Sequence, residues 1–278
     1  MLKQRVITAL VLVAFLLPAL FAASAWPFAV LILAGIAAAG WEWGRLNGAG
    51  ALAIILGTVL AAACALALWQ GWASAAPNLL WWFATLAWVL GGAWVLRGGP
   101  KAWSPLPRVL RWGLGLLLLW VGWLALANAR AIGINFILSV FCLVWAADIA
   151  AYFGGRAFGK HKLAPAISPG KSWEGVWSGM LGVLVLAAFW SLVVDRQLRV
   201  DSNSLYGQLS QRLGIFGAVL ALLFLAMMSV VGDLFESLVK RSAGAKDSSG
   251  LLPGHGGVLD RIDALLPVVP LALALTSL

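Results

Sequence analysis

Long apolar runs separated by short polar connections are the feature that most constrains the fold of this chain. Nine runs can be read, most of them close to the roughly 20 residues that a helix needs to cross a bilayer. They cover residues 6–25, 27–41, 51–69, 77–96, 112–129, 132–153, 176–194, 213–232 and 264–278. None alternates with a period of two, so helices rather than barrel strands must satisfy the backbone in lipid. The sequence predicts an all-α polytopic membrane protein with about nine transmembrane helices.

The composition excludes a water-soluble protein. Of the 278 residues, 63% are apolar and 10% are charged, against about 45–50% and 25% in soluble domains. No repeat or linker divides the chain, which predicts one integral membrane domain over residues 1–278, with N-terminal helices in 1–131 and polar loops concentrated in 132–278. The two cysteines lie inside apolar runs, and the spacing of cysteines and histidines matches no zinc site.

The basic residues predict the orientation in the membrane. With a cytoplasmic N-terminus and nine spans, 15 of the 19 Lys and Arg residues face the cytoplasm. The four exceptions are Arg130, Arg196, Arg199 and Arg212. This bias favours a cytoplasmic N-terminus and a periplasmic C-terminus, and it attributes the net charge of +9 to topology and anionic lipid rather than to nucleic acid.

The first apolar run also resembles a signal peptide. Lys3 and Arg5 precede it, and residues 23–25 read Ala-Ser-Ala, like a cleavage site. The run is longer than the 7–15 residues of a signal-peptide core, and another apolar run follows at once. We therefore expect a retained membrane anchor.

Polar residues near the end of the eighth run share one helical face. They recur at i, i+3, i+4, i+7 and i+8, and are Asp233, Glu236, Ser237, Lys240 and Arg241. One interpretation is a polar cavity at the cytoplasmic side of the membrane, because acids at membrane depth are usually functional. The other is a solvated helix end with a Glu236–Lys240 pair, and the spacing alone does not decide between them.

The loop that follows carries glycines and paired carboxylates. Gly254, Gly256 and Gly257 allow positive φ and close approach of backbone N–H groups to an anion. Asp260 and Asp263 then lie three residues apart at the start of the last helix. Mg²⁺ is usually held by one or two carboxylates together with phosphate oxygens, so the pattern favours a magnesium–polyphosphate site. The alternative is a plain turn with Asp260 as a helix cap.

A second polar stretch, residues 148–174, mixes glycine and serine with basic residues. Positive-inside topology explains its charges but not the glycines and serines, so we expect phosphate contacts there. Residues 170–172 read Gly-Lys-Ser, but Pro165 stands where a P-loop needs its first glycine, and a membrane helix precedes the segment. His255, in the later loop, could act as an acid or base or donate a hydrogen bond to phosphate.

These motifs resemble a known family, the bacterial phosphatidate cytidylyltransferases or CDP-diacylglycerol synthases. The segments that carry the resemblance are residues 237–241 (Ser-Leu-Val-Lys-Arg), 246–247 (Lys-Asp) and 252–263 (Leu-Pro-Gly-His-Gly-Gly-Val-Leu-Asp-Arg-Ile-Asp). Supporting segments are residues 148–156, 167–175 and 41–43 (Trp-Glu-Trp). The resemblance is specific over residues 145–263 and only compositional before them.

The resemblance implies transfer of a cytidylyl group from CTP to phosphatidate, giving CDP-diacylglycerol and pyrophosphate, at the cytoplasmic face of a bacterial inner membrane. It implies Mg²⁺, with room for a second cation, on Asp233, Asp260 and Asp263. The expected catalytic residues are Lys171, Ser237, Lys240, Arg241, Lys246 and His255, and the expected substrate-binding residues are Arg156, Lys160, Ser172, Gly254, Gly256, Gly257 and Arg261. The partners are then CTP, phosphatidate and the bilayer, and the sequence also allows a homodimer.

Two other functions compete with this interpretation. A CTP-dependent polyprenol or phytol kinase would attack the γ-phosphate with an alcohol, which needs a positioned base and releases CDP. An ion-coupled transporter would use Asp148 and Asp233 as a proton or sodium relay. Such a transporter would show no metal-dependent nucleotide turnover, and it leaves the glycine-rich loop unexplained.

Overall fold

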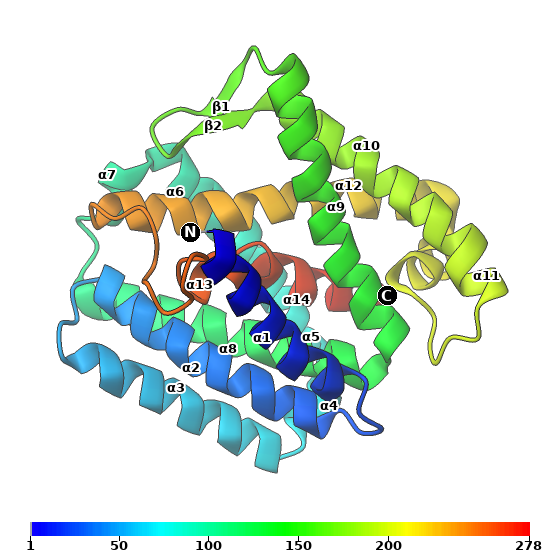
Figure 1. Ribbon diagram of the computed structural model, residues 1–278, viewed down its shortest axis with the longest axis horizontal. Helices are drawn as coiled ribbons and strands as arrows, with labels where there is room; N and C mark the ends of the chain where they lie inside the picture. Colours follow the sequence, from blue (N-terminus) through cyan, green and yellow to red (C-terminus); the bar gives the residue numbers. More distant parts are fainter. Residues whose placement is uncertain (1) are drawn as a thin grey trace.

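The chain folds into a bundle of helices with one short β-hairpin at its edge (Figure 1). A computed structural model describes residues 2–278, with side chains from residue 4 onward, so the expectation for the Lys3 side chain lies outside the described residues. The long helices are α1 (Leu2–Leu20), α2 (Trp26–Leu46), α3 (Leu52–Trp69), α8 (Arg108–Ile132), α9 (Ile134–Phe158), α10 (Trp173–Phe189), α12 (Leu205–Ser242) and α14 (Leu265–Thr276). The shorter elements are α4 (Trp72–Ala75), α5 (Asn78–Leu86), α6 (Gly92–Gly98), α7 (Pro100–Trp103), β1 (Lys162–Ala164), β2 (Ser168–Ser172), α11 (Asp195–Gln197) and α13 (Leu259–Ile262).

Seven helical segments within residues 2–278 are long and apolar enough to cross a membrane, which confirms the predicted all-α polytopic fold. They are Trp26–Leu46, Leu52–Trp69, Asn78–Gly98, Arg108–Ile132, Ile134–Phe158, Trp173–Gln197 and Leu205–Ser242. The third runs through a π-helical turn at Ala87–Gly91 and the sixth through another at Trp190–Val194. The first and last predicted spans are also helical, but their apolar helices Gln4–Leu20 and Leu265–Thr276 have fewer than 18 residues, so the count of nine stays a prediction.

The last helix is buried rather than peripheral. Almost every side chain of α14 is buried, and the helix lies between α5, α8 and α12 (Figure 1). A helix that is apolar all round belongs in the interior of a bundle. Its 12 residues extend about 18 Å, which is less than the roughly 30 Å of a hydrocarbon core.

The loop before α14 re-enters the bundle to make up that length. A Cβ on Gly232 of α12 would collide with the Asp263 carbonyl oxygen and with Pro267, so the start of α14 packs against α12 at this glycine. Gly232 lies ten residues, or about 15 Å, before the end of α12 at Ser242. The far end of α14, at Thr276, lines a second cavity with Asn128 and Arg212. The loop and α14 together therefore extend from one end of the bundle to the other.

Helix α12 contains a break that divides it into two parts. Gly214 has φ 66° and ψ 174°, which is not helical and which favours glycine. Ser204 caps the N-terminus, because its Oγ accepts a hydrogen bond from the Gly207 N–H at 3.1 Å. The longer C-terminal part of α12 carries the polar stripe.

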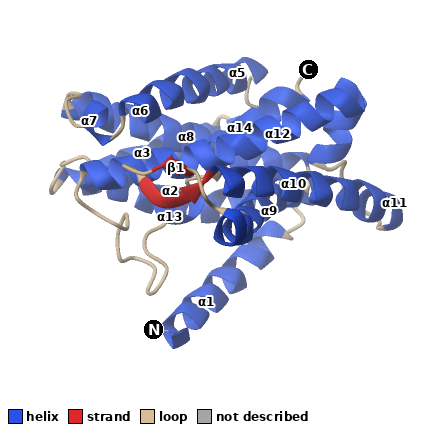
Figure 2. Cartoon of the chain, turned by 90° about the horizontal axis from the view of Figure 1, so that it is seen from above, coloured by secondary structure: helices blue, strands red, loops and turns tan. Residues whose placement is uncertain are grey.

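Helix α1 leans away from the other helices, and its first residues lie at the edge of the molecule (Figure 2). Contacts with α2 and hydrogen bonds near both of its ends attach it. Buried Arg130 of α8 donates hydrogen bonds to the carbonyl oxygens of Leu20 at 2.7 Å and Ala22 at 2.6 Å. Thr8 donates from its hydroxyl to the Pro253 carbonyl oxygen at 3.0 Å, which connects α1 to the glycine-rich loop.

The hairpin of β1 and β2 lies between α9 and α10, where the sequence predicted only a polar loop. Its strands are antiparallel, with Lys162 opposite Ser172. Glu174, at the start of α10, holds the hairpin through His161. Its carboxylate accepts a hydrogen bond from the His161 N–H at 3.2 Å and pairs with the His161 Nδ1 at 2.6 Å. On the other side, Arg241 of α12 donates to the Ile167 carbonyl oxygen at 3.4 Å. The hairpin therefore holds Lys171 on β2 above α12.

Candidate active site

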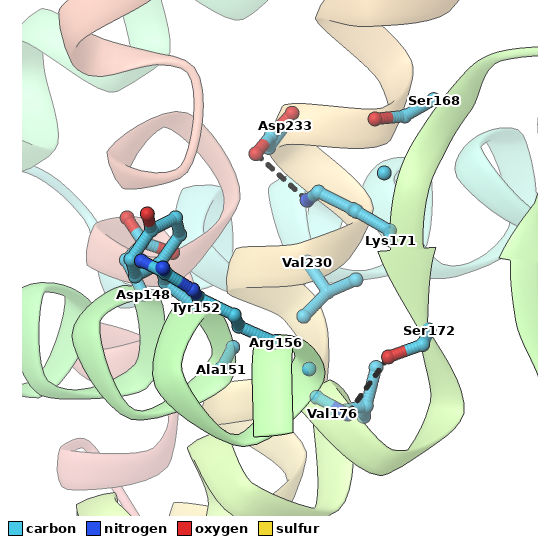
Figure 3. A pocket seen from close by; sticks show the side chains of 13 residues that line it. Asp148, Ala151, Tyr152, Arg156, Ser168, Lys171, Ser172, Val176, Val230 and Asp233 are labelled. Carbon is cyan, nitrogen blue, oxygen red and sulfur yellow. Dashed lines mark hydrogen bonds and ion pairs between the residues drawn. The ribbon is translucent and has the colours of Figure 1, made fainter. Parts of the chain in front are cut away.

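A cavity of about 560 Å³ opens between α9, α10, α12 and the hairpin (Figure 3). Its volume lies within the range of small-molecule sites, about 300–1,000 Å³. The side chains and backbone that line it come from Asp148, Ala151, Tyr152, Gly155, Arg156, Ser168, Gly170, Lys171, Ser172, Gly175, Val176, Val230 and Asp233. Carboxylates and cations therefore share one pocket with apolar and small residues.

An ion pair crosses this cavity. Lys171 Nζ on β2 lies 2.7 Å from Asp233 Oδ2 on α12, and both side chains are partly exposed, at 24% and 32% (Figure 3). The second oxygen, Asp233 Oδ1, accepts a hydrogen bond from Ser237 Oγ at 3.2 Å. Because the pair is partly hydrated, its charges can rearrange when a ligand enters more easily than those of a dry pair.

Four of the five residues of the predicted polar stripe on α12 contact one another in pairs: Asp233 with Ser237, and Glu236 with Lys240. Asp233 contacts Ser237, and Glu236 Oε2 lies 2.5 Å from Lys240 Nζ, each pair four residues apart. Lys240 Nζ also donates to Asp260 Oδ1 at 2.6 Å. Arg241 points elsewhere, donating to the carbonyl oxygens of Ile167 and Ala245, and its predicted contact with substrate stays a prediction.

Asp260 is held by the protein on both oxygens. Oδ1 accepts from Lys240, while Oδ2 accepts from the Ser248 N–H at 2.9 Å, the Ser248 hydroxyl at 2.8 Å and the Gly257 N–H at 2.8 Å. Burial raises the pKa of Asp260, but the hydrogen bonds from Lys240, Gly257 and Ser248 outweigh burial and hold that pKa well below its usual range. Its observed role is to fix the glycine-rich loop, so metal ligation by Asp260 stays a prediction.

The glycines of that loop have different roles. Gly254 and Gly256 have φ of 77° and 80°, the positive values that the sequence predicted these glycines could adopt. Gly257 is needed for space, since a Cβ there would collide with Ser248 Oγ and Glu42 Oε1. The N–H groups of residues 257–259 donate to the carboxylates of Asp260 and Glu42, so the protein's own acids occupy the amides expected to bind phosphate.

The other predicted residues are distributed around the cavity and the loop. Arg156 and Ser172 line the cavity, and Ser172 Oγ also caps α10 by accepting from the Gly175 N–H at 3.2 Å. His255 is half-buried, and its Nδ1 has no hydrogen-bond partner among the described residues. Three basic residues are exposed outside the cavity: Lys160, Lys246 and Arg261.

Sequence reasoning left three residues of this region without a role in the site. Asp148 and Tyr152 of α9 line the cavity, and their spacing of four residues on an apolar helix was the available signal. Glu42 of α2 is fully buried and accepts three hydrogen bonds from the glycine-rich loop, while the Ser248 hydroxyl lies 3.2 Å from its Oε2. Its signal was an acid at membrane depth within the Trp-Glu-Trp segment, but nothing in the sequence shows which loop it contacts.

Comparison with known proteins assigns the family. The model of the cytidylyltransferase family matches residues 3–278. The chain belongs to the cytidylyltransferase family. A phosphatidate cytidylyltransferase of Pseudomonas aeruginosa is 42% identical, the alignment covering 99% of this chain and 97% of that protein. One of Haemophilus influenzae is 38% identical over 97% of this chain and 96% of the relative, and one of Brucella suis is 44% identical over 50% and 46%.

Family membership confirms the resemblance seen in the motifs.

The carboxylates of the site fit a metal ion by their chemistry rather than by a preformed cluster. Within residues 4–278, no three His, Cys, Asp or Glu side chains cluster as a ready metal site. The donor chemistry still suits a hard cation, because Asp148 and Asp233 are oxygen donors in one cavity. Burial raises the pKa of nearby Asp263, and the negative charge of Asp233 raises it further, so a cation there would offset the repulsion.

Proposed function

We propose that this member of the cytidylyltransferase family transfers the cytidylyl group of CTP to phosphatidate, forming CDP-diacylglycerol and pyrophosphate for phospholipid synthesis. The observation that carries the proposal is similarity over nearly the full chain to two proteins named phosphatidate cytidylyltransferase. The cavity between α9, α10 and α12 supports it, because it offers cations for phosphate groups next to carboxylates for a metal.

The reaction needs positioning and charge neutralisation more than acid–base chemistry. A phosphate oxygen of phosphatidate, already anionic, forms a bond to the α-phosphorus of CTP as the bond to the bridging oxygen breaks and pyrophosphate leaves. Lys171 and Arg156 then bind phosphate oxygens, and Lys171 exchanges its contact with Asp233 for one with substrate. Lys240 keeps its place between Glu236 and Asp260 and holds these two carboxylates together.

Mg²⁺ belongs to the proposal as the cofactor. Asp233 and Asp263 would hold it, with Asp148 as a further donor in the cavity and Asp260 as the remaining predicted ligand. When bound, it would neutralise phosphate charge as the α-phosphorus is attacked. A second cation and the substrate contacts of the exposed loop residues are part of the same hypothesis.

We place the protein in the bacterial inner membrane with its cavity and N-terminus toward the cytoplasm and its C-terminus toward the periplasm. This proposal rests on the charge bias and on the position of α14, whose end lies beside Arg212 at the opposite end from the cavity. The homodimer stays a prediction, for which cross-linking in membranes is the measurement.

The test is an assay of the purified chain in lipid micelles with labelled CTP, phosphatidate and Mg²⁺. We expect CDP-diacylglycerol and pyrophosphate in equal amounts, and no product after chelation of the metal. A lipid kinase would instead release CDP and require a lipid alcohol. A transporter would show no nucleotide turnover, and either result would overturn the proposal.

A further inference from the structure

Glu42 is the most deeply buried carboxylate near the site, and no basic residue pairs with it. Its exposed fraction is 0%, and none of the ion pairs among residues 4–278 includes it. A buried charge without a counter-ion is costly unless hydrogen bonds satisfy it. The position of this acid therefore depends on the donors around it.

Four donors from one distant segment surround the Glu42 carboxylate. Oε1 accepts from the Ser249 hydroxyl at 2.5 Å and from the Val258 N–H at 3.0 Å. Oε2 accepts from the Leu259 N–H at 2.7 Å and lies 3.2 Å from the Ser248 hydroxyl. Hydrogen bonds to an ionised group are roughly twice as strong as neutral ones. Glu42 therefore fixes both ends of residues 248–259 against α2.

The same segment connects Glu42 to the polar stripe. Ser248 Oγ lies between Glu42 Oε2 and Asp260 Oδ2, and its single proton favours Asp260, the closer acceptor at 2.8 Å. Asp260 in turn receives Lys240. A shift of residues 248–259 would therefore move Asp260 and, through it, the Lys240 ammonium.

Helix α2 provides a rigid support at this point. Trp43, the residue after Glu42, stacks on Phe235 of α12 with ring centroids 6.0 Å apart and planes at 20°. Trp103 contacts both rings edge-on, with centroids 5.8 Å from Trp43 and 5.4 Å from Phe235. The carboxylate thus belongs to a part of α2 that is packed directly on the helix that carries the stripe.

We propose that Glu42 is a positioning residue of the transferase: it fixes residues 248–259 on α2 and so sets the place of Asp260 and Lys240 relative to the cavity. Glu42 does not line the cavity, so it would act through residues 248–259. The inference rests on the proposed function for its kinetic readout, and on the hydrogen bonds for its structural one.

The first test is Glu42→Gln, which keeps the size of the side chain but turns an NH₂ group toward donors. We expect kcat to fall about 10- to 100-fold, as for other buried partners of site residues, with a smaller change in KM for CTP. Ser249→Ala removes one of the four donors and should lower kcat about fivefold, which provides a milder variant if Glu42→Gln does not accumulate.

Asn47→Ala is the matched control. Asn47 is also buried at the end of α2, but its side chain bonds Trp103 Nε1 and the Trp43 carbonyl oxygen rather than the loop. It should lower the unfolding temperature while keeping kcat. Wild-type kcat in Glu42→Gln and Ser249→Ala would overturn the proposal, as would equal losses of kcat in Glu42→Gln and Asn47→Ala at equal losses of stability.

A labelling experiment separates this inference from the proposed function. Leu251 is 46% exposed in the segment that Glu42 holds, so Leu251→Cys, with Cys64 and Cys142 changed to Ala, reports on the loop without any turnover. Adding Glu42→Gln should raise the labelling rate several-fold, and adding Asn47→Ala should not. An unchanged rate overturns the positioning role, whereas absence of CDP-diacylglycerol from the wild type overturns only the transferase proposal.

Discussion

Three acids in and around the site contact partners from other parts of the chain. Asp233 of α12 pairs with Lys171 of the hairpin, Asp260 receives Lys240, and Glu42 binds amides 217 residues away at Leu259. Removing one member of such a set leaves the other charge or amide unpaired, which costs more than the contact itself contributes. Substitutions that keep shape but remove charge are therefore the informative ones.

Asp233→Asn should lower kcat by at least about 100-fold and raise the Mg²⁺ concentration needed for half-maximal activity. The variant loses a hard oxygen donor and leaves Lys171 without its counter-ion in the cavity. Magnesium titrations of CDP-diacylglycerol formation measure both effects, and Asp201→Asn at the other end of the bundle is the control. A wild-type magnesium dependence in Asp233→Asn would remove Asp233 from the metal site.

Arg241→Lys should raise KM for CTP or phosphatidate, or lower kcat, although the charge is kept. The guanidinium reaches two carbonyl oxygens at once, Ile167 at 3.4 Å and Ala245 at 3.2 Å, and so connects the hairpin to the end of α12. An ammonium cannot reproduce this planar fork. Steady-state kinetics with both substrates measure the change, and identical constants would assign Arg241 to topology alone.

At the scale of the elements, periodicity predicted what local sequence determines. The apolar runs became helices, and the four-residue spacing of Asp233 with Ser237 and of Glu236 with Lys240 became contacts. Contacts between segments far apart in the sequence produce no periodic pattern that could predict them. The sequence predicted Asp260 to lie in a turn or a metal site. Its contact with Lys240 forms because the loop before α14 packs back against α12, and the packing of α14 determines that position.

Asp201 joins two elements at the end opposite the cavity. Its carboxylate accepts hydrogen bonds from the Ile134 N–H at 2.6 Å and the Asn135 N–H at 2.9 Å, where α9 begins. Burial raises the pKa of Asp201, but these N–H groups outweigh burial and hold that pKa below its ordinary value of 3.8. A lowered pKa stabilises the fold above that ordinary value, and the stabilisation is lost as the pH falls below it.

Asp201→Asn should therefore destabilise the protein by about 1 kcal/mol near neutral pH, because one charge-assisted bond is lost at an accessible site. The difference from wild type should be constant from about pH 5 to 8 and should shrink below about pH 4, where Asp201 of the unfolded wild-type chain becomes protonated before that of the folded chain. Thermal unfolding in detergent across this range measures it. A difference that grows on acidification would contradict the assigned hydrogen bonds.

At the scale of the whole molecule, the two ends of the bundle differ in chemistry. One end holds the cavity, the hairpin and the polar stripe. The other holds a smaller cavity of about 400 Å³, lined by Ser74, Asn128, Arg212 and Thr276 among others. Basic residues are more numerous toward the first end, which the positive-inside rule assigns to the cytoplasm. In this orientation a nucleotide in the cytoplasm would reach the cavity without crossing the membrane.

Cysteines at the two ends should label with opposite sidedness. Ser168 lines the large cavity, and Ser74, exposed on the short helix α4, lines the small one. We expect Ser168→Cys to resist a membrane-impermeant thiol reagent in intact cells and to react in inverted vesicles, while Ser74→Cys reacts in intact cells. The unsubstituted chain is the control, because Cys64 is buried and Cys142 half-buried within α9. Labelling of both positions from one side would show that the bundle does not cross the membrane along its long helices, and a reversed pattern would place the cavity in the periplasm and exclude cytoplasmic CTP as its direct substrate.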